Sequence, residues 1–174
     1  MLAKRVKIAA MAEMLQGYRV LDLSQYLAGA GITRLLAELG PEIIKVELAP
    51  HGDPSRFIPW IEDGRSSVFI QNNRGKRSLA LDWDTPEGME ILRQLVPHCD
   101  VVVENFAVGV LERRNLHYEA LRELRPDLIM VSVSAYGQTS PWASRPGFDG
   151  IIQATAGLMA LNGDPEGAPM PLGF

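Results

Sequence analysis

Two glycines at the start of a predicted helix could bind a phosphate group. In Ala28-Gly29-Ala30-Gly31, backbone N–H groups can hold a pyrophosphate, and Glu47, at the end of the next predicted strand, could accept a ribose hydroxyl. Against a dinucleotide site, Arg34 occupies the third glycine position of the fingerprint, and several residues separate the strand from Gly29, where the fingerprint has a tight turn. Close packing of the helix on its strand explains the glycines without a ligand, so NAD binding remains an alternative.

Two groups of basic residues could also bind phosphate. The segment Arg74–Arg77 follows Asn72 and Asn73, and these side chains can form charge-assisted hydrogen bonds with phosphate oxygens. A solvated hairpin explains the same segment equally well. Arg113 and Arg114 are the second group, for which composition alone favours a solvent-exposed helix face.

The remaining reactive residue types show no pattern of a site. His51, His98 and His117 lack the spacing of metal ligands, so the sequence predicts no metal. The single cysteine, Cys99, has no neighbouring partner and is expected to be a buried core thiol. Because one cysteine cannot form an internal disulfide, a cytoplasmic enzyme is the default expectation.

Composition limits the class of protein. With 47% hydrophobic and 22% charged residues in a chain of 174, intrinsic disorder is not expected. A net charge of −4 provides no global field for nucleic acid or an anionic membrane, so neither is a predicted partner. No stretch approaches the roughly 18 apolar residues that a membrane span requires. An anionic ligand would therefore have to be bound by a few local basic groups.

The elements that would position these residues follow an α/β pattern. A short apolar run over 19–23, a helical pattern over 28–39 and a second run over 42–46 predict a βαβ unit with parallel strands. Residues 48–65 have no period and predict a long loop, while Thr85-Pro86 is typical of a helix start. Further strands are predicted at 78–81, 100–103 and 128–133, the last as a strand covered on both faces.

This order predicts a Rossmann-like parallel sheet flanked by helices. In such sheets ligands bind beyond the carboxyl ends of the strands. Four segments fall there in this sequence, namely 24–31, 47–53, 105–109 and 134–138. Each carries Gly, Asn or Ser, as ligand-lining turns often do.

These loops carry motifs that resemble one family. The motifs are Gly17-Tyr-Arg-Val-Leu-Asp-Leu-Ser24 with Leu27-Ala-Gly29, Leu39-Gly40, Ile43-Ile-Lys-Val-Glu47, Asn73-Arg-Gly-Lys-Arg-Ser78 with Leu81-Asp82, and Asp100-Val-Val-Val-Glu-Asn-Phe106. Together with Ser134-Ala-Tyr-Gly137 and Arg145-Pro-Gly-Phe-Asp149, they resemble the class III (CaiB/BaiF type) CoA-transferases, the family of formyl-CoA transferase, carnitine CoA-transferase and α-methylacyl-CoA racemase. The resemblance covers residues 17–174 and leaves 1–16 as an N-terminal extension.

The resemblance implies where coenzyme A binds. Its CoA-contacting positions fall here on Gln25, Tyr26, Leu27, Ala28, Leu81, Asp84, Asn105, Phe106 and Arg113. CoA is a polyanion, so Arg113 becomes a candidate phosphate ligand. Leu48 and Asp84 depart from the pattern, because formyl-CoA transferase has basic residues at these positions.

The resemblance also implies a mechanism. In the family an aspartate attacks the acyl-CoA thioester, and the resulting anhydride gives an aspartyl-CoA thioester that an acceptor carboxylate displaces. That aspartate is expected shortly after Phe174, so the chain is interpreted as the truncated, CoA-binding N-terminal part of a larger two-domain fold. Asp149 lies where formyl-CoA transferase has a glutamate near the acyl group and could have a supporting role.

The resemblance leaves alternatives open. A racemase is one, but Phe148 stands where racemases carry a general-base histidine, and phenylalanine cannot transfer a proton. A non-catalytic CoA-binding module is another. The expected partners of the full protein are an acyl-CoA, a carboxylic acid and a second copy in an interlocked homodimer.

Overall fold

The computed structural model describes residues 14–58 and 60–173, which divide into two compact units. The first ends at Val133 and the second begins at Ser134. The motifs predicted one domain over 17–174 and did not predict this division. Of the predicted extension 1–16, residues 1–13 lie outside the described part of the chain.

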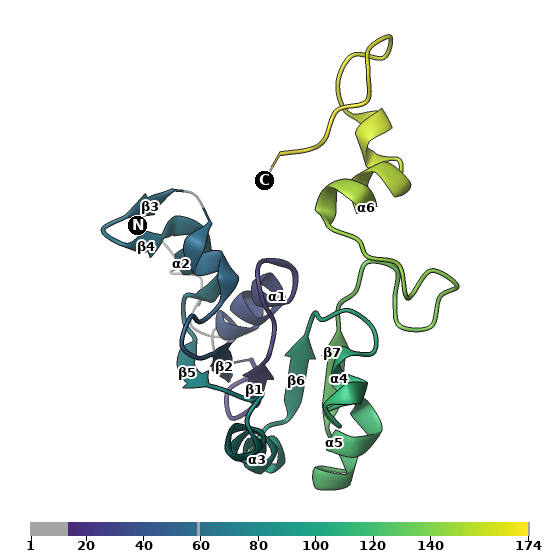
Figure 1. Ribbon diagram of the computed structural model, residues 1–174. Helices are drawn as coiled ribbons and strands as arrows, with labels where there is room; N and C mark the ends of the chain where they lie inside the picture. The colour runs from purple at the N-terminus through teal and green to yellow at the C-terminus, as the bar shows by residue number, and fades with distance from the viewer. Residues whose placement is uncertain (1–13, 59, 174) are drawn as a thin grey trace, which may run out of the picture. The chain divides into compact units, whose positions relative to one another are not determined.

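A five-stranded parallel sheet forms the centre of the first unit (Figure 1). The strand order is β5-β2-β1-β6-β7, and every pairing in it is parallel. The strands are β1 (Arg19–Asp22), β2 (Glu42–Leu48), β5 (Arg77–Leu81), β6 (Val101–Glu104) and β7 (Ile129–Ser132). This arrangement confirms the predicted α/β, Rossmann-like sheet.

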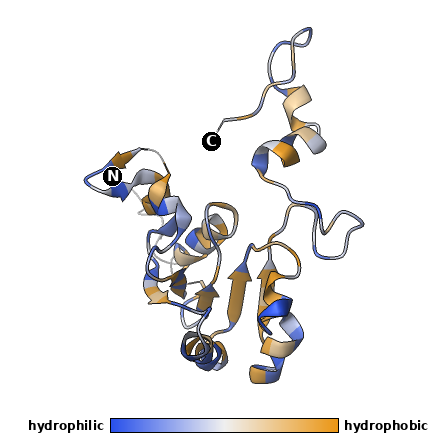
Figure 2. Cartoon of the chain, in the orientation of Figure 1, coloured by the Kyte–Doolittle hydropathy of each residue, from blue (hydrophilic) through white to orange (hydrophobic). Residues whose placement is uncertain are grey.

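Helices cover the sheet and create a separate apolar cluster on each face. They are α1 (Ala28–Ala37), α3 (Pro86–Leu95), α4 (Val110–Arg113) and α5 (Tyr118–Leu124), while α2 (Ser67–Asn73) packs against α1. Leu21 and Val102 pack in the larger cluster with residues of α3, α4 and α5, whereas Val20 and Val103 pack in the smaller one with residues of α1. Neighbouring residues enter opposite clusters because side chains alternate along a strand. Figure 2 shows the resulting apolar strands in orange.

Local chemistry explains two of the predicted boundaries. Thr85 caps α3, since its Oγ accepts a hydrogen bond from the Gly88 N–H at 3.1 Å and Pro86 takes the first helical position. At the start of α1, a Cβ on Gly29 would collide with the Cβ of Ser24. Close packing of α1 on the end of β1 therefore requires this glycine, in agreement with the explanation that needed no ligand.

The region between β2 and β5 differs from the prediction. Residues 48–65 are not simply a loop, since they contain a 3-10 helix η2 (Pro54–Phe57) and the strand β3 (Ile61–Glu62), which pairs antiparallel with β4 (Arg65–Ser66). The hairpin interpretation of 72–77 was wrong, because the apolar run before it lies in α2 and β5 pairs parallel with β2. Ser66 caps α2 by accepting from the Phe69 N–H, a start signal that the short apolar run concealed.

Strand β7 also departs from expectation. It was predicted to be covered on both faces, yet in the described part of the chain it lies at the sheet edge, beside β6, and Ile129 is 58% exposed. An apolar run gives the composition of a strand and not the elements that pack on it, so it could not show that one face of this strand is exposed.

The second unit is small and turn-rich. It contains α6 (Asp149–Thr155) and the 3-10 helix η4 (Leu158–Leu161). The buried Gln153 side chain bonds the backbone of Leu172, accepting from its N–H at 2.8 Å and donating to its carbonyl at 3.2 Å. This amide ties α6 to the segment after η4. Among the described residues of both units, no helix has the length and hydrophobicity to cross a membrane.

Candidate functional site

The strand order places a ligand crevice between β1 and β6. From β1 the chain proceeds to β2 and β5 on one side, and then returns to β6 and β7 on the other. In α/β proteins ligands bind at such a reversal, in a crevice at the carboxyl ends of the two central strands. The β1–α1 loop, residues 23–27, and the pair Asn105–Phe106 follow these two strands. Six of the nine predicted CoA-binding residues lie at these two strand ends, or at the first residue of α1.

Asn105 connects the two sides of the crevice. Its Oδ1 accepts from the Gln25 N–H, and its Nδ2 donates to the Gln25 carbonyl, both at 2.8 Å. The adjacent Tyr26 has φ +58°, a left-handed conformation that costs a non-glycine residue roughly 1–2 kcal/mol. Tyr26 is 45% exposed. The loop therefore holds a strained backbone in place and presents an aromatic side chain to solvent.

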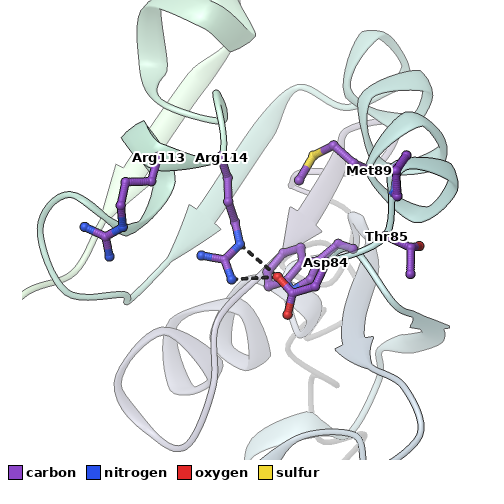
Figure 3. Close-up of a pocket in the computed structure, with 7 residues that line it drawn as sticks. Asp84, Thr85, Met89, Arg113 and Arg114 are labelled. Atoms are coloured by element: carbon purple, nitrogen blue, oxygen red, sulfur yellow. Dashed lines mark hydrogen bonds and ion pairs between the residues drawn. The ribbon is translucent and has the colours of Figure 1, made fainter.

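Phe106 leads from this crevice to a neighbouring pocket. Its ring lies 5.6 Å, centroid to centroid, from that of Trp83 at a tilted angle. Trp83 lies at an open pocket of about 440 Å³ on the surface of the first unit. The other lining residues are Asp84, Thr85, Pro86, Met89, Arg113 and Arg114 (Figure 3).

The charged side chains of this pocket differ in whether they form ion pairs. Arg114 bonds the Asp84 carboxylate at 2.6 and 3.2 Å, and that carboxylate is half exposed. Arg113 is exposed, and no acidic side chain within residues 14–58 and 60–173 forms an ion pair with it. An apolar floor beside an uncommitted guanidinium suits a ligand with a flat aromatic group and a phosphate.

The basic segment 74–77 offers no comparable site. Lys76 is buried, and its Nζ donates to Asp22, Asn73 and the Ala30 carbonyl at 2.8–2.9 Å. Burial lowers the pKa of Lys76 against the opposing effect of Asp22. Arg74 and Arg77 form ion pairs with Glu38 and Glu42. Carboxylates of the same chain thus already form ion pairs with the three cations that were candidate phosphate ligands in this segment.

Glu47 is equally committed, which weakens the dinucleotide interpretation. The carboxylate is buried and accepts from Arg56 at 2.7 and 2.8 Å, from Ser78 and from the Asp53 N–H. Burial alone would raise its pKa, but these donors outweigh burial and lower the pKa to about 2. The ribose acceptor that NAD binding needs is therefore occupied.

Glu104, at the end of β6, has the opposite environment. Its carboxylate is buried and accepts from the Phe106 N–H at 2.7 Å. Burial raises its pKa, while hydrogen bonds from Ser132 and from the Phe106 backbone oppose the rise. Glu104 therefore fixes the turn that carries Phe106, and no cation within residues 14–58 and 60–173 forms an ion pair with it.

Of the remaining residues, Leu81 and Cys99 lie in the core of the first unit, and Asp149 belongs to the second unit. Leu81 is 8% exposed and packs in the larger apolar cluster, so its side chain has little surface to offer. Asp149 belongs to the second unit, where it is exposed and accepts from Gln153 in its own helix. Cys99 is fully buried, as predicted, and burial raises the pKa of its thiol to about 11. Because the thiolate is the reactive form, a thiol with this raised pKa is not a candidate nucleophile.

Sequence reasoning missed the buried charged residues under the β1–α1 loop. Asp22, Lys45 and Asp53 are at most 2% exposed. Their signal was available, since Asp22 and Lys45 occupy positions in apolar strands whose side chains must point inward by alternation. A charge at such a position requires a buried partner.

Comparison with known proteins identifies the class. The sequence profile of CoA-transferase family III matches residues 15–174, and the chain belongs to this family. It is 42% identical over 166 residues to the succinate–glutarate CoA-transferase of Agrobacterium fabrum, covering 91% of this chain and 42% of that protein. It is 39% identical over 157 residues to the succinyl-CoA:glutarate CoA-transferase of Homo sapiens, covering 90% and 36%.

A solved structure agrees with the fold. A CAIB/BAIF family protein from Brucella suis is 40% identical and superimposes with a TM-score of 0.85, covering 92% of this chain and 43% of that one. The family resemblance of the motifs is thereby confirmed. The chain spans about two fifths of the length of these relatives.

Proposed function

We propose that this chain supplies the acyl-CoA binding part of an acyl-CoA:carboxylate CoA-transferase. The observation that carries the proposal is a chain of neighbours: Asn105 bonds the β1–α1 loop, and the next residue, Phe106, packs on Trp83 of the pocket that contains Arg113. In this proposal Arg113 binds a phosphate of CoA, and the Met89 side chain, with the buried Trp83 ring beneath the pocket, contacts its adenine. The crevice between β1 and β6 receives the part of the ligand nearer to the thioester.

The covalent chemistry is assigned to an aspartate that the resemblance expects after Phe174. Its carboxylate would attack the thioester carbonyl and release CoA thiolate, and the thiolate would then attack the aspartyl carbonyl and release the donor acid. An acceptor carboxylate would reverse these steps to leave a new acyl-CoA. The residues described here would bind and orient the acyl-CoA, and Asp149 remains a candidate for a supporting role near the acyl group.

The substrate class follows from the names of the relatives. Several of them name succinate, succinyl-CoA or glutarate as substrates. We therefore propose succinyl-CoA or a similar dicarboxylyl-CoA as the donor and a short dicarboxylic acid as the acceptor, in a homodimer of the full-length protein located in the cytoplasm. No group of three His, Cys, Asp or Glu side chains within residues 14–58 and 60–173 could hold a metal, and the proposed reaction needs none.

Calorimetric titration of the chain with CoA tests the proposal. CoA is expected to bind, and Arg113→Ala is expected to weaken binding roughly tenfold, because a charge-assisted bond to phosphate is lost. Arg122→Ala, which removes an exposed cation from α5, is the matched control and should leave the affinity unchanged. Binding of NAD with none of CoA would contradict the proposal. In the full-length protein, exchange of a substrate α-proton in deuterated water would favour the racemase alternative.

A further inference from the structure

The backbone of the β1–α1 loop is bonded by side chains from distant parts of the chain. Lys45 Nζ donates to the Ser24 carbonyl at 2.7 Å, and Asp53 Oδ1 accepts from the Tyr26 N–H at 3.2 Å. Asn105 bonds the residue between them, Gln25, through both of its backbone groups. Each of three successive loop residues is thus bonded to a side chain outside the loop, where neither helix nor sheet supplies a partner.

Lys45 and Asp53 act together in this arrangement. Their side chains are each 1% exposed, and Lys45 Nζ lies 2.8 Å from Asp53 Oδ2. Such a pair must have its remaining hydrogen-bonding capacity satisfied to offset the loss of water. Lys45 Nζ also donates to the Ser24 carbonyl, and Asp53 Oδ1 accepts from Tyr26 and Ser55, whereas Asp53 Oδ2 accepts no hydrogen bond among the described residues and meets Lys45 by charge alone. The geometry of the pair is therefore coupled to that of the loop on both sides of Gln25.

The pair connects β2 to the start of the 3-10 helix η2. Lys45 projects from β2, whereas Asp53 caps the 3-10 helix η2 after it. The segment from Lys45 to Asp53 contributes no residue to the pocket that contains Arg113. The ion pair is connected to the proposed ligand surface through the backbone of Ser24 and Tyr26.

We propose that the Lys45–Asp53 ion pair is a positioning device that fixes the β1–α1 loop in the conformation that receives acyl-CoA. The two residues act through the loop backbone and do not contact the ligand. This inference rests on the proposed function, since it assigns the loop's ligand to that site. It also makes a separate statement about the free chain, namely that the pair keeps the loop ordered before any ligand binds.

Site-resolved amide hydrogen exchange and CoA titration test the two statements separately. In Lys45→Met, exchange of the Gln25 and Tyr26 amides is expected to become roughly tenfold faster or more. The loop can then open without breaking a bond from Lys45 to Ser24, and Asp53 is no longer held where it accepts from Tyr26. The amides of β1 should retain their protection to within about twofold, since the sheet pairing is untouched. The dissociation constant for CoA is expected to rise by roughly tenfold, because the binding-competent loop is less populated.

Arg125→Met is the matched control. It breaks another lysine- or arginine-to-aspartate pair, Arg125–Asp100 at 2.6 Å, next to the amino end of β6. Exchange in the loop and CoA affinity should both match those of the unmodified chain. If Lys45→Met does not fold, Asp53→Asn makes the same test, since it retains the side-chain volume but cannot serve Lys45 and Tyr26 together.

Three outcomes would overturn the inference. They are unchanged loop exchange in the variant, equal loss of protection in the loop and in β1, and faster loop exchange with unaltered CoA affinity. If the unmodified chain does not bind CoA at all, the proposed function fails instead. In that case the exchange measurement still decides whether the pair orders the loop.

Discussion

Two groups of charges at the carboxyl edge of the sheet differ in what they can do for a ligand. The group under the β1–α1 loop contains Asp22, Lys45, Asp53 and Lys76, whose side chains are 0–2% exposed and paired with one another. The group in the pocket contains Asp84, Arg113 and Arg114, which are partly or largely exposed. Both are rich in cations, but only the second has a guanidinium free of acids among the described residues. Burial and pairing, and not the number of basic residues, decide where an anion can bind.

The largest expected effect comes from breaking the buried group. Lys76→Met leaves the Asp22 carboxylate buried without its cation, although Ser24 and Thr33 still donate to it. The free energy of unfolding is expected to fall by about 3–5 kcal/mol, the cost of removing one partner of a buried pair. Urea denaturation at pH 7 measures this loss.

Arg77→Met is the control from the same basic segment. Arg77 is 78% exposed and pairs with Glu42 at the surface. Its removal should change the free energy of unfolding by less than about 1 kcal/mol. Equal losses in the two variants would show that burial does not separate the two kinds of cation.

The next effect is a contrast in pH dependence between two buried glutamates. The folded pKa of Glu47, about 2, lies below its ordinary value of 4.5, so its contribution to stability is present above pH 4.5 and is lost as the pH falls toward 2. Glu47→Gln should therefore be less stable at pH 7 and should show a flatter decline in acid. Urea denaturation at a series of pH values measures both.

Glu104 is expected to behave in the opposite way. Its folded pKa is raised, so its contribution is complete below pH 4.5 and is lost as the pH rises through the folded value. Glu104→Gln should be at least as stable as the unmodified chain at pH 7, because the amide is neutral and can still accept from Phe106. A variant that is much less stable at pH 7 but not at pH 4 would mean that the charged form is the favoured one.

The smallest effect concerns the surface pair in the pocket. Asp84→Asn removes the charge that engages Arg114, and an exposed pair of this kind contributes only about 0–1 kcal/mol to stability. Release of Arg114 is expected to strengthen CoA binding by roughly threefold, measured by calorimetry. Weaker binding in this variant would instead indicate that the Asp84 carboxylate contacts the ligand directly, as the family pattern implies.

Local patterns were sufficient for most of the sheet and for one side of the site. Apolar runs located β1, β2 and β6, Thr85-Pro86 located α3, and the rule for strand ends located Asn105 and Phe106. Patterns failed where a short run had two interpretations. Residues 68–70 lie in helix α2, so no hairpin forms around 74–77, and the strand within 128–133 has an exposed Ile129 instead of being covered on both faces.

By itself, the sequence determined the strands of the main sheet, the helices α1 and α3, the family, and the strand ends where a ligand would bind. These follow from periodicity, capping residues and motifs, which are local in the chain. Only the tertiary structure decided which cations are free. Lys76 and Arg113 look alike as basic residues, yet one donates to Asp22, 54 residues away, and the other faces solvent. Such pairing depends on contacts between distant segments, and the energy of a charge depends on how much water those contacts exclude.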